Sequence, residues 1–104
     1  MAFSDLRRAY ILTPGHLEVM RGIAQYHTHR QEPAALAAWQ QVAEAKGASL
    51  DDEIAWCREA LRLGALKVVQ DQLAKWELRP EVQQIPGVLS VKAEMAAING
   101  RSHP

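Results

Sequence analysis

The chain has 104 residues, a length that suits one domain with one modest core, and its apolar residues are too dispersed for a membrane span or a signal peptide. Its twelve basic and twelve acidic side chains cancel, which excludes the broad positive field of nonspecific DNA-binding proteins. A single cysteine excludes an intrachain disulfide and favours a reducing compartment, so we expect a cytoplasmic protein.

Capping residues and helix breakers divide the first half of the chain into three predicted helices. A short helix is capped by Ser4 and ends near Leu12. Thr13-Pro14 then reads as an N-cap followed by proline at the first helical position, and a second helix covers 16–30. A third helix begins around 31–33 and closes at Lys46-Gly47, where glycine favours a left-handed C-terminal cap.

Apolar residues spaced by three and four positions mark the inward faces of the second and third helices. These residues are Leu17, Met20, Ile23, Ala24 and His27 on the second helix, and Ala35, Leu36, Trp39, Val42 and Ala43 on the third. Trp39 has Ala35 and Ala43 one turn to either side. We therefore expect Trp39 to be the central core residue, packed between two helical hairpins.

The second half of the chain predicts two longer helices and a terminal one. Ser49 or Asp51 opens the fourth helix, which breaks at Gly64, and the fifth helix stops near 78–80. One turn is expected at 81–85, followed by a last helix over 88–98 that ends at Asn99-Gly100. The expected inward residues are Ile54, Trp56, Cys57, Leu61, Leu66, Val69, Leu73 and Trp76.

Shifting the sequence by 34 residues aligns apolar landmarks of the two halves. Ile23 falls on Cys57, and the other coincident pairs are Tyr26 with Ala60, Ala35 with Val69, Trp39 with Leu73, and Val42 with Trp76. A period of 34 with two helices per unit is typical of tetratricopeptide arrays. We therefore predict a single all-α domain over 1–104: an N-terminal helix in 1–13, helical hairpins in 14–47 and 48–81, a capping helix in 82–100 and a tail in 101–104.

In such an array, the first helix of each hairpin lines a concave face. Eight residues are predicted to share that face: Leu17, Met20, Ala24 and His27 from the first hairpin, and Ile54, Arg58, Leu61 and Arg62 from the second. Apolar residues edged by arginines suit an amphipathic partner helix whose acidic flank faces the arginines. The alternative is that these residues contact one another in a small core. The sequence thus predicts a protein partner and no nucleic-acid or membrane partner. It is compatible with a homo-oligomer or a hetero-oligomer.

No pattern in the sequence predicts catalysis or a cofactor. His27 and His29 are two residues apart, which turns their side chains roughly 200° from each other around a helix and prevents a shared metal ion. Cys57 lies in an apolar stripe with no visible base to activate it. The acidic run 51–53 fits a helix N-terminus, where the helix dipole favours negative charge. We expect no metal, no cofactor and no enzymatic activity.

A small helix-turn-helix DNA-binding regulator is the alternative function. Segment 49–74 has a suitable length, with Gly64 at the turn. A helix that reads DNA normally brings several basic residues to the phosphates. The second helix of this segment instead offers the mixed set Lys67, Gln70, Asp71 and Lys75.

The two units, 19–47 and 53–81, resemble tetratricopeptide repeats. The family's small and aromatic positions are matched in the first unit, and its hairpin glycine and closing proline in the second; these residues are Ile23, Tyr26, Ala35, Trp39, Gly64 and Pro80. The units depart from the family where Ile23 replaces a glycine and Trp76 an alanine. The resemblance covers about two-thirds of the chain and implies a stack of helical hairpins that holds another polypeptide.

A narrower resemblance covers WCREALRLGALKVVQDQLAKW (56–76) and RPEVQQIPGVLSVKAEM (79–95). This stretch is similar to the C-terminal half of the small tetratricopeptide-like chaperones of type III secretion systems, in its cysteine-containing helix, Leu-Gly-Ala-Leu turn, leucine-rich helix and terminal helix. Segment 1–15 does not reproduce the N-terminal segment usual in that family. The resemblance implies a cytoplasmic chaperone that holds a needle subunit.

Overall fold

The computed structural model describes residues 16–102 and is all-helical over that range, as the sequence predicts. Its helices are α2 (Leu17–His29), α3 (Ala34–Glu44), α4 (Leu50–Leu63), α5 (Leu66–Glu77), the short 3-10 helix η1 (Pro80–Val82) and α6 (Pro86–Ser102). No β-strand occurs within 16–102. The predicted helix over 4–12 and the Thr13-Pro14 cap lie outside the described residues.

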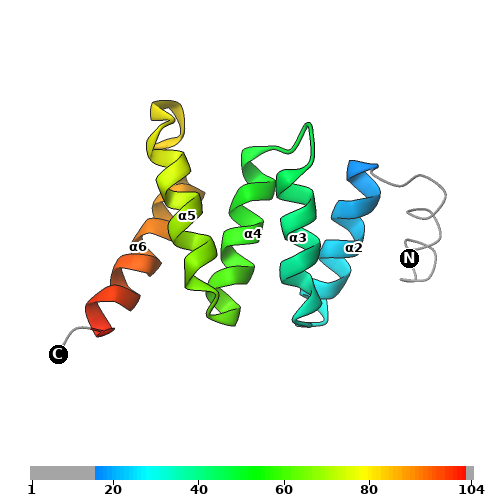
Figure 1. The fold of residues 1–104 in the computed structure, drawn as a ribbon, viewed down its shortest axis with the longest axis horizontal. Coiled ribbons are helices and arrows are strands. Elements are labelled where there is room, and N and C mark those ends of the chain that lie inside the picture. Colours follow the sequence, from blue (N-terminus) through cyan, green and yellow to red (C-terminus); the bar gives the residue numbers. More distant parts are fainter. Residues whose placement is uncertain (1–15, 103–104) are drawn as a thin grey trace.

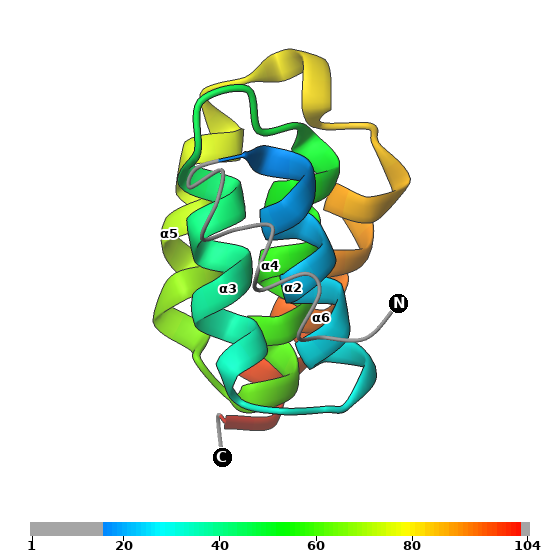
Figure 2. The ribbon, with the colours of Figure 1, turned by 90° about the vertical axis from the view of Figure 1, so that its right-hand side faces the viewer.

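Consecutive helices run antiparallel in a row, from α2 at one end of the molecule to α6 at the other (Figure 1). Viewed along that row, α3 and α5 lie on one side and α2 and α6 on the opposite side (Figure 2). Helix α4 is central, because it packs against α3, α5 and α6. The row is elongated, with extents of 49 × 29 × 19 Å.

Local capping explains where α4 begins and ends. The Ser49 hydroxyl accepts a hydrogen bond from the Asp52 backbone N–H, and the Asp52 carboxylate accepts one from the Ser49 backbone N–H. This reciprocal capping box fixes the helix start at the first of the two predicted positions. Gly64 ends the helix in a left-handed conformation, with φ of 77°, that a residue with a Cβ rarely adopts.

The chain after α5 differs in detail from the sequence prediction. The predicted turn at 81–85 is the 3-10 helix η1, and α6 begins at Pro86 rather than Val88. Proline is suited to a first helical position because its φ is already helical. The predicted stop at Asn99-Gly100 is wrong, since α6 continues through Ser102. Gly100 lies inside the helix, where a glycine costs only about 1 kcal/mol and does not force an end.

Two groups of buried side chains flank α4. The α2–α4 cluster consists of Ala24, Ala35, Trp39, Val42 and Trp56. The α4–α6 cluster is larger and consists of Ile54, Cys57, Ala60, Val69, Trp76, Val82, Val88, Val91 and Met95. Trp39 is buried, as predicted, but it is not the central core residue, because it belongs to the smaller cluster. The largest fully buried side chain among the described residues is Trp76, in the other cluster.

A glycine sets the closest approach between α4 and α6. A Cβ atom placed on Gly87 would lie only 2.7 Å from Cδ1 of Ile54 and 3.3 Å from its Cγ2. Real Cβ atoms do not approach another heavy atom so closely, because dispersion turns to steep repulsion. The absence of a side chain at Gly87 therefore lets the first turn of α6 pack directly on α4.

The helix positions follow the 34-residue period. A shift of 34 carries α2 onto 51–63, and α4 spans 50–63; the same shift carries α3 onto 68–78, and α5 spans 66–77. Buried residues of the second helices coincide under this shift. Ala35 and Val69 are both fully buried, as are Val42 and Trp76.

Candidate functional site

Two adjoining hollows lie between α4 and α6. One, of about 440 Å³, is lined by Asp51, Ile54, Ala55, Arg58, Ile85, Pro86 and Gly87. The other, of about 470 Å³, is lined by Arg58, Leu61, Arg62, Ser90, Glu94 and Ile98. Because both include Arg58, they are neighbouring parts of one depression along the two helices. We call these residues together the α4–α6 groove.

Arg58 is the residue that the two hollows share. Its side chain is exposed, and it makes no hydrogen bond or ion pair with another residue in the part of the chain that the structure describes. The four other arginines in 16–100 each pair with a carboxylate: Arg21, Arg30, Arg62 and Arg79. An exposed cation in a partly apolar groove, with its donors uncommitted, is available to an acidic group from outside.

The predicted residues of α2 do not join this groove. Ala24 is fully buried in the α2–α4 cluster, and Leu17 and Met20 pack against that cluster. His27 is part-buried, with its Nδ1 3.5 Å from a Glu32 carboxylate oxygen and its ring edge-on to Tyr26. The apolar stripe of α2 therefore packs within the fold, and contact of these four residues with a partner stays a prediction.

The predicted residues of α4 do lie together at the groove, but they differ in burial and in whether another side chain already binds them. Ile54 is buried in the α4–α6 cluster and reaches only the floor of the first hollow. Leu61 is half-buried, packs on the same cluster and lines the second hollow. Arg62 is held by Glu59, with Nη2 2.6 Å and Nε 3.1 Å from one carboxylate oxygen. Arg58 is thus the cation of the pair that remains available.

Residues of α6 complete the groove, and the sequence reasoning missed them because it treated this helix only as a cap. Ser90, Glu94 and Ile98 recur every fourth position, which places them on one face of the helix. That spacing was readable in the sequence. The pairing of this face with α4 was not, because it depends on the tight contact at Gly87.

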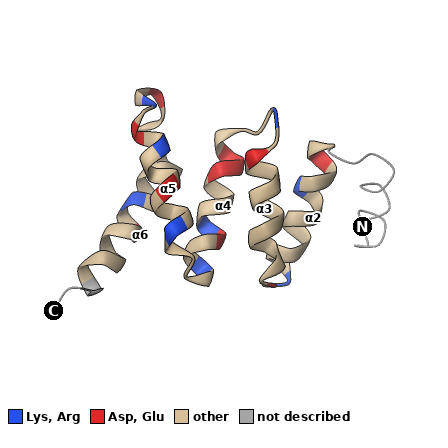
Figure 3. Cartoon of the chain, in the orientation of Figure 1, with Lys and Arg blue, Asp and Glu red and all other residues tan. Residues whose placement is uncertain are grey.

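Charges follow a simple order along α4. Figure 3 shows acidic residues on its first turn, and basic residues beside acidic ones in its second half. Internal partners neutralise most of them: Asp52 pairs with Arg21, Glu53 with Arg79, and Glu59 with Arg62. Asp51 and, on α6, Glu94 form no hydrogen bond or ion pair with another residue in 16–100. Among the described residues, the groove therefore presents three charges without a partner: Asp51 in the first hollow, Glu94 in the second, and Arg58 in both.

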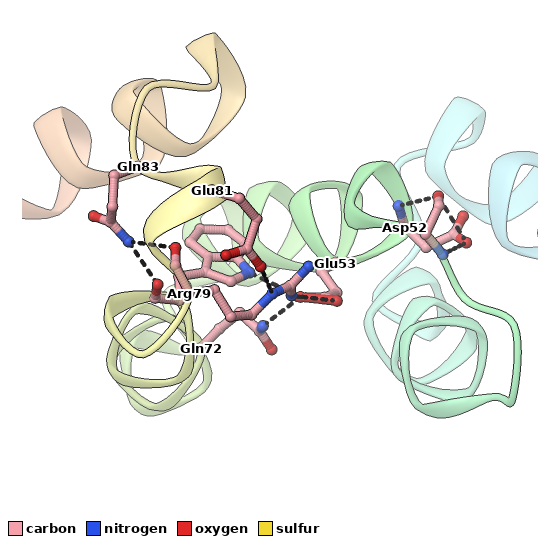
Figure 4. A network of polar contacts seen from close by, with 8 residues as sticks. Asp52, Glu53, Gln72, Arg79, Glu81 and Gln83 are labelled. Carbon is pink, nitrogen blue, oxygen red and sulfur yellow. Dashed lines mark hydrogen bonds and ion pairs between the residues drawn. The ribbon is translucent and has the colours of Figure 1, made fainter.

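The acidic run 51–53 has structural roles beyond the helix dipole. Glu53 projects toward Gln72 and Arg79 (Figure 4). Its Oε1 accepts hydrogen bonds from Gln72 Nε2 at 2.9 Å, from the Trp76 indole N–H at 2.8 Å and from Arg79 Nη1 at 3.0 Å. Burying a carboxylate is costly unless donors surround it. Here the donors come from α5 and the turn after it, so Glu53 ties α4 to α5.

Asp52 ties α4 to α2 in the same way. The Arg21 guanidinium donates to both carboxylate oxygens, Nε to Oδ1 at 2.9 Å and Nη2 to Oδ2 at 2.6 Å. The hydrogen bond from Arg21 lowers the pKa of Asp52 below its ordinary value, against the opposing effect of burial. Such bidentate pairs fix orientation as well as charge.

A third hollow, of about 390 Å³, lies where α3, α4 and α5 meet. Its lining includes Glu44, Glu53, Trp56, Lys75 and Arg79. The Trp56 indole nitrogen is buried without a hydrogen-bond partner in the described part of the chain. Acidic and basic groups are balanced around this hollow, so it offers no net attraction to either kind of ion.

The structure places the single cysteine and the potential metal ligands of residues 16–100. Burial, followed by the charge of Glu53, raises the pKa of the Cys57 thiol to about 12, which keeps it protonated near neutral pH. No group of three or more potential metal ligands occurs among residues 16–100.

Comparison with known proteins identifies no relative of this chain. No protein-family model matches this chain, and neither a curated protein nor a solved structure matches it. In the described region, none of the helices has both the length and the hydrophobicity to cross a membrane.

Proposed function

We propose that this chain is a protein-binding helical module that holds an amphipathic helix of a partner protein in the α4–α6 groove. In this proposal α2–α3 and α4–α5 are two tetratricopeptide-like hairpins and α6 caps them. The protein then acts as a cytoplasmic chaperone or adaptor rather than an enzyme. A needle subunit of a type III secretion system is the candidate partner suggested by the resemblance of residues 56–95.

The repeat interpretation is supported by the match between helix positions and the 34-residue period. Both hairpins contain two helices of similar length, and equivalent positions of α3 and α5 are fully buried. Proteins built from such units bury one face of each helix against its neighbours and keep another face for binding.

The observation that carries the proposal is Arg58, an exposed arginine that has no partner among residues 16–100 and is shared by two hollows lined by both apolar and charged side chains. Hydrophobic grooves edged by charge are the usual seat of an amphipathic helix, whose apolar side chains fill the groove while its charges meet those at the rim. Arginine is also among the residues that contribute most to protein interfaces.

Site-specific photo-crosslinking in the native host tests this proposal. A photoreactive amino acid replaces Glu94, which is exposed at the groove, and in a matched control it replaces Gln70, which is exposed on α5. We expect the probe at 94 to capture one partner, with the crosslinked peptide in a segment of helical apolar spacing. The probe at 70 should not capture it.

Ser90→Trp, added to the Glu94 probe, asks whether the groove itself is occupied. Ser90 lines the second hollow, so an indole there fills the space that the partner needs. Leu61 is unsuitable for this purpose, because it packs on the α4–α6 cluster and its substitution would disturb folding. Capture should be lost while the circular dichroism spectrum stays helical. Equal capture from both probe positions, or capture that survives Ser90→Trp, would contradict the proposal. Salt-dependent binding to DNA would instead favour the regulator alternative.

A further inference from the structure

We infer that the partner segment is a helix of about three turns with an acidic residue near one end, facing Arg58, and a basic residue about two turns away, facing Asp51. This inference rests on the proposed function and specifies the chemistry of the partner. It follows from the uncommitted charges of the groove and from the groove's length.

The length comes from the spacing of the lining residues. On α4 they run from Asp51 to Arg62, and on α6 from Pro86 to Ile98. Eleven or twelve helical rises of 1.5 Å, from the first lining residue to the last, span roughly 17 Å, or about three turns. A partner helix that lies lengthwise in the groove therefore contacts it over a similar distance.

The charge order comes from which groups lack a partner. Asp51 and Arg58 are seven residues apart on α4, which is close to two full turns, so they lie on the same side of the helix about 10 Å apart along its axis. Arg62 is also basic, but Glu59 already occupies its guanidinium. Asp52 and Glu53 are likewise occupied by Arg21 and Arg79. The groove therefore selects its partner through one acidic and one basic residue of α4, and not through a broad positive or negative surface.

The α6 side of the groove adds one further selection. Glu94 lines the same hollow as Arg58 and is also unpaired among the described residues. A partner with several acidic residues would meet repulsion from both Asp51 and Glu94. Such like-charge contacts exclude wrong partners more strongly than matching contacts hold the right one. A uniformly acidic helix is thus a poor occupant, and a helix of alternating charge is a good one.

Two synthetic helical peptides provide the test. Each is alanine-rich with two leucines on the groove-facing side; the first carries lysine and, seven positions later, glutamate on that side, and the second carries three glutamates there. Chemical-shift changes of the backbone amides at Ser90, Glu94 and Ile98 report binding to the full chain. We expect the lysine–glutamate peptide to bind about tenfold more tightly than the acidic one at low salt.

Equal affinities of the two peptides would overturn the charge order while leaving the groove as a helix-binding site. Failure of both peptides to shift the groove amides would overturn the inference. In that case the crosslinking result at position 94 decides whether the proposed function survives.

Substitutions then connect the preference to Arg58. Arg58→Gln should weaken binding of the lysine–glutamate peptide by about threefold to fivefold, the upper part of the range for an exposed ion pair. Lys67→Gln removes one cation from the exposed face of α5 and should change that affinity by less than about 1.5-fold. An equal loss from both variants would show that net charge, and not Arg58, sets the affinity.

Discussion

The α2–α4 cluster buries two tryptophans and the α4–α6 cluster one, and the indole N–H groups of Trp39 and Trp76 find different kinds of acceptor. Trp76 is fully buried and donates to Glu53, which comes from another helix and also accepts from Gln72 and Arg79. Trp39 donates to the Thr28 hydroxyl at 2.7 Å, within its own hairpin. The hydrogen bond of Trp76 thus links α5 to α4, whereas the hydrogen bond of Trp39 stays within the α2–α3 pair.

The smaller cluster also contains a polar group with no partner in the described residues, the Trp56 indole N–H. A buried donor without an acceptor costs about 1–3 kcal/mol relative to a paired one. Together these differences suggest that the half of the molecule around α4, α5 and α6 is the more stable half. The difference matters for function, because the proposed groove is built on that half.

Trp76→Ala should have the largest effect on stability. Deleting a fully buried aromatic side chain typically costs about 3–5 kcal/mol, and here Glu53 also loses a donor, so we expect the upper part of that range. This is a large part of the roughly 5–15 kcal/mol that stabilises an ordinary domain. Urea denaturation followed by circular dichroism measures it. A midpoint close to that of the unaltered protein would show that Trp76 is not at the centre of the fold.

Trp39→Ala should cost somewhat less, near the lower end of the same range of about 3–5 kcal/mol. The labelling rate of Cys57 measures the opening of the α4–α6 cluster independently, because its buried thiol reacts with a disulfide reagent only when that cluster opens. In a row of helices each unit depends mainly on its neighbours. Trp39→Ala should therefore accelerate labelling of Cys57 less than Trp76→Ala does. Equal acceleration would show that the two clusters open together.

Much of the fold was predictable because local signals set it. Ser49, Gly64 and the breaks between helices follow from capping and backbone preferences that a few neighbouring residues determine. The burial of Trp39, Val69 and Trp76 follows from helical spacing of apolar residues. The end of α6 was missed because glycine only weakly opposes a helix, so Gly100 did not decide where it stopped.

The candidate site was only half predictable, because the 34-residue shift does not describe the first helix of each hairpin. Under this shift the fully buried Ala24 coincides with the exposed Arg58. A shift of 33 instead matches Ala24 with Cys57, and both are fully buried. One residue turns a helix by about 100°, so this difference rotates the face of α2 away from the position expected for a binding surface.

The tertiary partners of the acidic run were not readable from the sequence at all. The helix dipole stabilises acidic side chains at positions 51–53, and it acts on all three residues in the same way. The structure separates them: Asp51 is exposed, Asp52 meets Arg21 and Glu53 meets Arg79. These contacts join positions 26 to 31 residues apart, and no local pattern specifies them.

A pair of conservative substitutions sharpens the comparison of the two clusters. Trp76→Phe and Trp56→Phe remove the same ring and N–H group from buried sites. Within the described part of the chain, only Trp76 loses a hydrogen bond, and the acceptor of that bond is a carboxylate. We expect Trp76→Phe to cost about 1.5–3 kcal/mol more than Trp56→Phe, the range for a hydrogen bond to a charged group. Equal losses in urea denaturation would mean that the Trp56 N–H finds an acceptor in solution.

The smallest predicted effect concerns the link between α2 and α4, and it depends on pH. The pKa of Asp52 is lowered in the folded protein, chiefly by the hydrogen bond from Arg21. A carboxyl group whose pKa falls on folding stabilises the protein above its unfolded pKa of about 3.9, and this contribution disappears as the pH falls through the folded value. Asp52→Asn should therefore cost about 1 kcal/mol at pH 7, since solvent partly screens the pair and the cap is weakened rather than lost.

The cost of Asp52→Asn should shrink steadily as the pH is lowered below about 4, because the wild-type carboxyl is then protonated and, like the asparagine, carries no charge. Asp51→Asn is the matched control, since Asp51 lies on the same turn and is exposed without a partner in the described residues. Its effect on the unfolding free energy should vary little over the same pH range. If both variants show the same pH dependence, the helix dipole rather than Arg21 is the main stabiliser of negative charge at the start of α4. The contact between α2 and α4 would then rest on the apolar packing of Ala24 and Trp56.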